Sequence, residues 1–133
     1  MPVSTDDYVA ISDLLGRYCW AVDSGDEIGW SSLWTEDCVF AGAMPEPLMG
    51  REAMKMIPRS VSGGSGGKLR HLAGSLHCDY DGGDSNAIIA RYYNLVSNWS
   101  KGGALSCFGT TTLRLVRDGG GWLIARSDTD MLT

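Results

Sequence analysis

The sequence predicts an α+β domain in which helices come first and a meander of long antiparallel strands follows. Apolar residues recur at helical spacing in the first half of the chain, and the period changes to two after the glycine-rich stretch at 62–67. Three glycine-containing separators, DGGDS, KGG and DGGG, divide the second half into strands, as hairpin connections do. Glycines at the strand ends, together with Gly74 inside one strand, allow such a sheet to curl. We therefore expect a cone-shaped, mostly antiparallel sheet, closed by three N-terminal helices around an apolar pocket.

The first helix is expected at 5–23, where Thr5 offers an N-cap and two acidic residues follow in the first turn. Ser24 and Gly25 end it. Its apolar residues at helical spacing are Val9, Ile11, Leu14, Leu15, Tyr18, Cys19 and Val22.

Two shorter helices are predicted before the sheet. One begins at Asp26 as its cap and carries Trp30, Leu33 and Trp34 on one face. The other is REAMKMIPRS, which we expect Pro58 to end. Between them, DCVFAG is typical of a short strand and PEPLMG of a turn. The long strands are expected at 69–80, 86–100, 104–117 and 121–132.

The stretch SGGSGGKLRH, residues 62–71, resembles a phosphate-binding loop only superficially. Counting from Gly67 and Lys68, Ser62 stands where the first glycine of a P-loop belongs, and Leu69 stands where its hydroxyl residue belongs. A nucleotide site is therefore excluded here. Glycine and serine make the stretch flexible, and it joins the third helix to the sheet just before His71.

Length and charge limit the class of protein. The 133 residues suit a single domain, 1–133. A net charge of −5 argues against nucleic acid or an anionic membrane as a partner, because both require a basic face. No secretion signal or membrane-spanning run is visible, so a cytoplasmic protein is expected.

The four cysteines have no metal-binding spacing, so we expect reduced thiols and no metal.

Asp23 and His71 are the candidate catalytic residues. Histidine is the side chain that titrates nearest neutrality, and a carboxylate that accepts one imidazole N–H fixes the tautomer and stabilises the imidazolium. Asp23 closes the first helix and His71 opens a strand. The residues alone leave open that His71 is merely buried and that Asp23 is merely a helix-end residue. His77 shares a face with His71 unless a bulge near Gly74 separates them.

Amphipathic and polar residues near the predicted pocket could contact a substrate. A hydroxyl or amide there would orient the substrate, and aromatic rings would form an apolar wall. Asp128 is expected to share a face with Trp122, Ile124 and Arg126 on the last strand. The candidate substrate-binding residues are Tyr18, Trp34, Phe40, Tyr92, Asn94 and Asp128.

Three segments resemble the SnoaL-like branch of the nuclear transport factor 2-like superfamily. They are YVAISDLLGRYCWAVDSGDEIGWSSLWTEDCVF, RHLAGSLHCDYDGGDSNAIIARYY and GTTTLRLVRDGGGWLIARSD. The resemblance covers nearly the whole chain and implies a curled sheet closed by three helices. It is specific for the fold and weak for the reaction, because one fold hosts many chemistries.

Within that superfamily, AVDSGD and LRHLAG resemble the scytalone dehydratase and hexachlorocyclohexane dehydrochlorinase group. The resemblance implies that His71 abstracts a proton and that Asp23 orients it, without a cofactor. It also implies a homo-oligomer, a trimer by the dehydratase resemblance and a dimer otherwise. The group's pocket tyrosines correspond to Val22 and Phe40, and its second histidine falls near 96–97, so the substrate-polarising groups differ.

The favoured function is a cofactor-free lyase, a dehydratase or dehydrohalogenase, acting on a small, largely apolar substrate that could be cyclic. One alternative is a ketosteroid-isomerase-like or polyketide-cyclase-like enzyme with Asp128 as its base. Another is a ligand-binding or assembly protein without catalysis. Contact between Asp23 and His71 would favour the first interpretation over the last.

Overall fold

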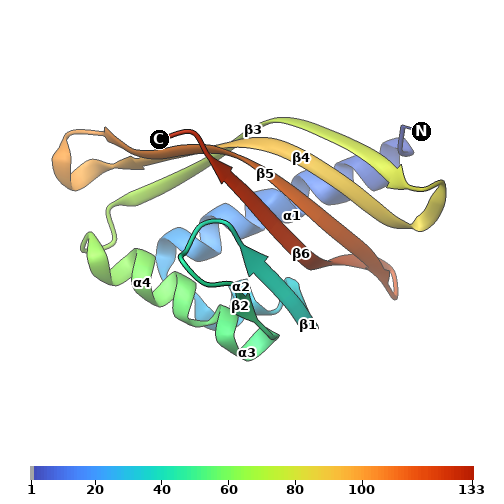
Figure 1. The fold of residues 1–133 in the computed structure, drawn as a ribbon, viewed down its shortest axis with the longest axis horizontal. Coiled ribbons are helices and arrows are strands. Elements are labelled where there is room, and N and C mark those ends of the chain that lie inside the picture. Colours follow the sequence, from blue (N-terminus) through green and yellow to red (C-terminus); the bar gives the residue numbers. More distant parts are fainter. Residues whose placement is uncertain (1) are drawn as a thin grey trace.

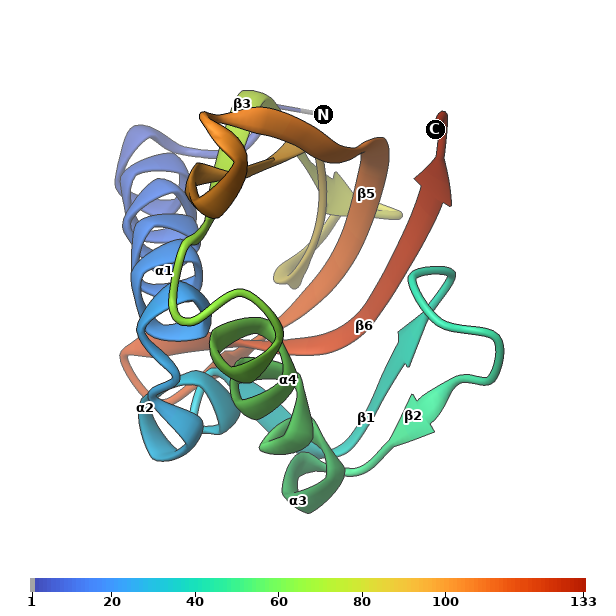
Figure 2. The ribbon, with the colours of Figure 1, turned by 90° about the vertical axis from the view of Figure 1, so that its left-hand side faces the viewer.

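The computed structural model describes residues 2–133 as a six-stranded sheet packed against helices. The sheet order is β2-β1-β6-β5-β4-β3, with β1 and β6 parallel and the other pairs antiparallel. Figure 2 shows the long strands curving around an interior that α1 bounds on one side and α4 below. The elements are α1 (Thr5–Ser24), α2 (Glu27–Ser31), β1 (Trp34–Ala41), β2 (Leu48–Met49), α3 (Arg51–Met54), α4 (Met56–Gly64), β3 (Leu69–Asp81), β4 (Asp84–Asn98), the 3-10 turn η1 (Trp99–Lys101), β5 (Ala104–Asp118) and β6 (Gly121–Met131).

The helix α1 lies across the curled sheet and is capped at both ends (Figure 1). Ser4, rather than the expected Thr5, is its N-cap, and the Ser4 side chain accepts a hydrogen bond from the Asp7 N–H. Gly25 ends the helix at a φ of 73°, a left-handed conformation that glycine adopts without strain. None of the helices in residues 2–133 is both long enough and apolar enough to cross a bilayer.

The segment after β1 differs from the expectation in three places. Leu48 and Met49, expected in a turn, form β2 and pair with β1. The third helix is split into α3 and α4, and Pro58 does not end it. Pro58 lies in the first turn of α4, where a missing N–H costs no hydrogen bond. The helix therefore continues to Gly64, and the glycine-rich stretch is partly helical.

Trp34, expected on the face of the second helix, is instead the first residue of β1. The helix ends at Ser31, and the Ile124 N–H bonds the Leu33 carbonyl, which draws the chain into the sheet. The predicted strand 86–100 also ends earlier, at Asn98, because η1 follows it.

Bulges in β3 and β6 decide whether His77 and Asp128 face the interior. In β3, the pairs Gly74–Tyr93 and His77–Arg91 leave one extra residue on β3, and Ser75 there has a φ of 57°. This shift turns His77 outward, whereas His71 stays on the inner face opposite Val96. In β6, Ala125 is the extra residue between the pairs that Ile124 and Arg126 make with β5.

An aromatic cluster fills the core beneath α1. The rings of Tyr18 and Trp30 are 5.1 Å apart between centroids, and those of Trp30 and Trp34 are 5.2 Å apart. Phe40 packs edge-on against both indoles. Both tryptophans are fully buried. Offset and edge-on rings stabilise such a core beyond the area that they bury.

At the far end of the cone, Asp7 ties α1 to two strands. Its carboxylate accepts hydrogen bonds from the Tyr80 hydroxyl at 2.5 Å and from Arg117 Nη2 at 3.2 Å. Burial raises the pKa of Asp7, but the bonds from Tyr80 and Arg117 outweigh it and leave the pKa below the ordinary value of 3.8. The ionised form of Asp7 is therefore favoured by folding.

Asp7→Asn is expected to lower the free energy of unfolding by about 1–2 kcal/mol, because charged hydrogen bonds contribute that much. Since the folded pKa lies below 3.8, this contribution is present above that value and is lost as the pH falls through the folded pKa. Denaturant unfolding at a series of pH values tests this. The deficit should persist near neutral pH and shrink in acid, and Asp6→Asn, at the exposed neighbouring position, serves as the control. An equal deficit at every pH would contradict the argument.

Candidate active site

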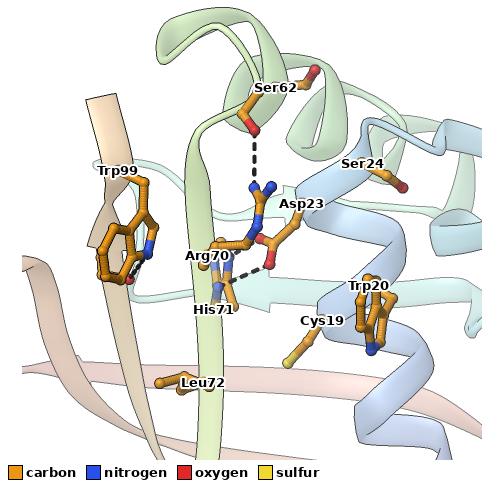
Figure 3. A pocket seen from close by; sticks show the side chains of 11 residues that line it. Cys19, Trp20, Asp23, Ser24, Ser62, Arg70, His71, Leu72 and Trp99 are labelled. Carbon is orange, nitrogen blue, oxygen red and sulfur yellow. Dashed lines mark hydrogen bonds and ion pairs between the residues drawn. The ribbon is translucent and has the colours of Figure 1, made fainter. Parts of the chain in front are cut away.

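Asp23 and His71 meet where the last turn of α1 faces the start of β3 (Figure 3). The His71 ring atom Nδ1 lies 2.6 Å from Asp23 Oδ1, and the His71 backbone N–H donates to Asp23 Oδ2 at 3.0 Å. Both side chains are nearly buried, with 13% and 10% of their surface exposed. Because both carboxylate oxygens bind the same residue, the ring is held in position and in orientation.

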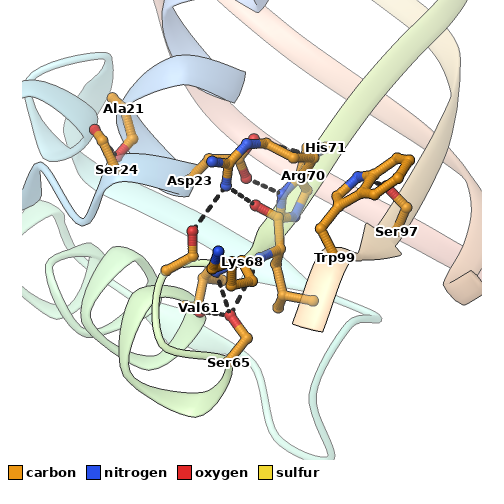
Figure 4. A network of polar contacts seen from close by, with 12 residues as sticks. Ala21, Asp23, Ser24, Val61, Ser65, Lys68, Arg70, His71, Ser97 and Trp99 are labelled. Atoms are coloured by element: carbon orange, nitrogen blue, oxygen red, sulfur yellow. Dashed lines mark hydrogen bonds and ion pairs between the residues drawn. The ribbon is translucent and has the colours of Figure 1, made fainter. Parts of the chain in front are cut away.

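The glycine-rich stretch forms a compact turn that positions His71, rather than a flexible linker. The Gly67 N–H bonds the Ser62 carbonyl, and the Ser65 hydroxyl accepts hydrogen bonds from the N–H groups of Lys68 and Leu69 (Figure 4). Gly67 has a φ of 77°, which side-chain-bearing residues rarely adopt. The turn therefore fixes where β3 begins.

His71 lies on the walls of three cavities: one inside the cone, one beside the end of α1, and one between the middle of α1 and β3. The inner cavity, inside the cone, has a volume of about 280 Å³, and the outer cavity, beside the end of α1, has a volume of about 570 Å³. Since Nδ1 faces Asp23, Nε2 is the ring nitrogen that remains for a bound molecule. The inner cavity is lined by Tyr18, Val22, Phe40, Ala43, Met44, Ile57, Ser60, Val61, Leu69, His71, Asn94, Val96, Ser106, Cys107, Thr129 and Met131.

Of the expected substrate-binding residues, Tyr18, Phe40 and Asn94 line the inner cavity. Trp34 and Tyr92 do not line it, and both are buried in the core below. Burial raises the pKa of Tyr18 and of Tyr92, and the neighbouring Tyr92 phenol adds to the shift of Tyr18. Both hydroxyls therefore keep their protons.

Asp128 does not face the cavity, contrary to the expected shared face with Trp122 and Ile124. The bulge at Ala125 inverts the alternation of β6, so Asp128 points outward and pairs with Arg126 at 2.7 Å. Half of the Asp128 side-chain surface is exposed. Asp128 therefore lines none of the three cavities that His71 lines.

Thr129 takes the place that Asp128 was expected to hold, and the sequence interpretation missed it. The Thr129 hydroxyl lies 3.0 Å from the Thr111 hydroxyl on β5, which places a polar pair on the inner wall. Ser106 and Cys107 were missed as well. Strand alternation identifies Thr129 only when the position of the bulge is known.

The Cys19 thiol, beside the dyad that Asp23 and His71 form, is a weak nucleophile, and the side chains around this dyad form no metal-binding cluster within residues 2–133. Burial, reinforced by the Asp23 charge, raises the pKa of the Cys19 thiol to about 11, so this thiol stays protonated. Within residues 2–133, no three His, Cys, Asp or Glu side chains gather in a way that could hold a metal ion.

The geometry predicts the tautomer of His71. Neutral His71 should carry its proton on Nδ1, because Asp23 accepts there, and should present an unprotonated Nε2. The ¹⁵N chemical shifts of the ring nitrogens measure this, and the exposed His77 is an internal reference. Asp23→Asn should abolish the preference, because an amide cannot offer two acceptors to the ring and to the backbone N–H. A proton found on Nε2 of neutral His71 would contradict the assignment.

Comparisons with known structures support the fold. Aln2 from a Streptomyces species is 22% identical, with a TM-score of 0.87 over 98% of this chain and 94% of that one. An NTF2-like protein with a cystatin-like fold from Novosphingobium aromaticivorans is 23% identical, with a TM-score of 0.83 over 96% and 82%. A protein of the same organism named "Putative Scytalone Dehydratase" is 17% identical, with a TM-score of 0.77 over 98% and 89%. The TM-scores establish a shared fold.

A search of curated proteins found no match. The profile of the SnoaL-like domain, in contrast, matches residues 3–128, which is nearly the whole chain. That match agrees with the helices packed on a curled sheet and with the similar structures. The chain belongs to the SnoaL-like domain family.

Proposed function

We propose that this protein is a cofactor-free lyase in which His71 is the base and Asp23 orients it. The observation that carries the proposal is the 2.6 Å contact between His71 Nδ1 and Asp23 Oδ1, with the imidazole on the wall of the inner cavity. A base needs a fixed ring, one free nitrogen and a counter-charge for the imidazolium that forms. The dyad offers all three.

The reaction would proceed by elimination across two neighbouring carbons. Nε2 of His71 takes a proton from one carbon, the C–H electron pair becomes the new double bond, and the leaving group departs from the other carbon with its bonding pair. Asp23 stabilises the imidazolium during this step. If hydroxide departs, the imidazolium returns its proton and water is formed. If halide departs, the proton passes to solvent.

The inner cavity indicates the class of substrate. Its volume of about 280 Å³ lies at the low end of the range for small-molecule sites. Its wall is largely apolar, with a few polar groups such as Asn94, Ser60 and the Tyr18 hydroxyl. A small, mainly apolar and compact molecule, a ring for example, suits this lining. We propose that the Tyr18 side chain, which lines this cavity and keeps its proton, donates to an oxygen of the substrate.

Two other functions fit the geometry less well. An isomerase or cyclase with Asp128 as its base would need that carboxylate in the cavity, whereas it is half-exposed and paired with Arg126. A protein that only binds a ligand has no need of a carboxylate and an imidazole held together in a nearly buried position, because burying a carboxylate costs free energy.

We further propose a homo-oligomer, with a trimer preferred to a dimer, that assembles through the outer face of the sheet. Tyr93 and Phe108 stack at 5.9 Å between centroids, and half of the surface of Tyr93 is exposed. Leu105, which is 55% exposed, adds to the apolar character of this face.

The lyase proposal is tested with a panel of small β-hydroxy and β-halo carbonyl compounds, cyclic ones included. For any compound turned over, His71→Gln should reduce kcat at least about 1,000-fold, and Asp23→Asn should reduce it about 100-fold, because the base and its orienting partner are lost. His77→Gln and Asp128→Asn should stay within about twofold, as exposed residues usually do. Full activity in His71→Gln would refute the mechanism, and a loss in Asp128→Asn would restore the alternative base.

Sedimentation velocity tests the assembly. The wild-type chain is expected to sediment as a trimer, and Tyr93→Glu should shift it towards the monomer, because a buried unpaired charge opposes association. Arg91→Glu, on the same strand and the same face beside the bulge, is the matched control for added negative charge. A monomeric wild-type protein would exclude the assembly.

A further inference from the structure

We propose that the outer cavity is a second ligand site, which binds a flat, conjugated carboxylate between two tryptophans. It is about twice as large as the inner cavity, at about 570 Å³ against about 280 Å³. It lies between the end of α1, the glycine-rich turn and the start of β3. Its lining comprises Cys19, Trp20, Asp23, Ser24, Ser62, Gly67, Arg70, His71, Leu72, Ser97 and Trp99. This site shares Asp23 and His71 with the proposed reaction centre, but binding there does not require the elimination to take place.

Two indole side chains flank the opening. In Figure 3, Trp99 lies on one side and Trp20 on the other, with Arg70, His71 and Leu72 between them. Trp99 is 58% exposed and Trp20 is 81% exposed, which is unusual for the largest apolar side chain. Together with Leu72 they form an apolar opening, and its aromatic walls suit a planar molecule.

The Trp99 ring is held in place although it is exposed. Its Nε1–H donates to the Ser97 hydroxyl at 3.0 Å. Behind the ring, a Cβ on Gly103 would come within 2.9 Å of the indole, so only glycine allows the ring to pack this closely there. An exposed indole fixed by a hydrogen bond and a close backbone contact is a pre-organised wall, and pre-organisation lowers the entropic cost of binding.

Arg70 supplies the charge that the ligand must match. Its Nη1 donates to the carbonyl oxygens of Gly67 at 2.9 Å and Leu69 at 2.7 Å, which anchors the guanidinium (Figure 4). Nη2 and Nε keep N–H groups for another acceptor. Within residues 2–133, Arg70 forms no ion pair, because the carboxylate in this cavity, Asp23, is bound through both oxygens to His71.

These features together define the ligand class. A planar conjugated group would stack against the Trp99 indole, and a carboxylate would accept the free N–H groups of Arg70, a pairing for which guanidinium is suited. The wall holds one carboxylate, that of Asp23, and both of its oxygens bind His71. Protonated Cys19 and the bonded hydroxyl of Ser24 add no further negative charge. The overall charge of −5 would repel an anion, so local capture depends on Arg70.

The test is isothermal titration calorimetry of the full chain with cinnamate, and with the neutral cinnamamide as its shape-matched control. Arg70→Gln should weaken cinnamate binding at least about tenfold and leave cinnamamide unchanged, because only the anion loses a charged bond. Trp99→Ala should weaken both compounds. Ala43→Trp, in an exposed loop at the inner cavity, should leave both affinities unchanged, because it fills the other cavity.

Three results would overturn the proposal. Equal cinnamate affinity in Arg70→Gln and in the wild type would remove the anion site. Loss of cinnamate binding in Ala43→Trp would place the compound in the inner cavity. Absence of binding, together with a lower sedimentation coefficient for Trp99→Ala, would show that a second copy of the chain covers the indoles. Turnover by Asp23 and His71 is a separate measurement. Failure of the outer ligand site can therefore be distinguished from failure of the lyase proposal.

Discussion

The site depends on the way one carboxylate joins α1 to the first long strand. Asp23 accepts a hydrogen bond from the backbone of His71 and lies 2.6 Å from its ring, so one contact fixes both the strand and the side chain. A buried carboxylate costs free energy unless its acceptors are satisfied, and here one residue satisfies both oxygens. The same contact holds the end of α1 against β3 and places the imidazole between two cavities.

The glycines near Asp23 and His71 set the conformation of the backbone and contribute no reactive group. Gly25 ends α1 in a left-handed conformation just after Asp23, and Gly67 adopts the same conformation before β3 begins. Both turns are short and hydrogen-bonded. The two catalytic candidates are 48 residues apart in sequence, yet they lie beside tight turns whose geometry leaves them little freedom. This rigidity is what a general base requires, since a displaced ring loses its contact with the substrate.

The bulges in β3 and β6 determine which reactive side chains lie on the inner face of the sheet and which lie on the outer face. The bulge after Gly74 leaves His71 inside and turns His77 to solvent. The bulge at Ala125 places Thr129 inside and Asp128 outside. Without the second bulge, the alternation of β6 would turn Asp128 to the inner face in place of Thr129. One inserted residue in a strand therefore selects between a carboxylate and a hydroxyl on the cavity wall.

The sequence by itself determined that helices come first and that a curled sheet follows, because helical periodicity, strand alternation and glycine turns are local signals. It offered Asp23 and His71 as separate candidates, and the resemblance of AVDSGD and LRHLAG to the scytalone dehydratase group joined them as a pair. It also placed Tyr18 and Phe40 among the inward side chains. Only the tertiary structure decided that Pro58 lies within α4, that Trp34 and Tyr92 are core residues, and that Asp128 faces outward. The start of a helix depends on packing against neighbouring elements, and a bulge depends on the register with the partner strand. Neither can therefore be predicted from the local sequence alone.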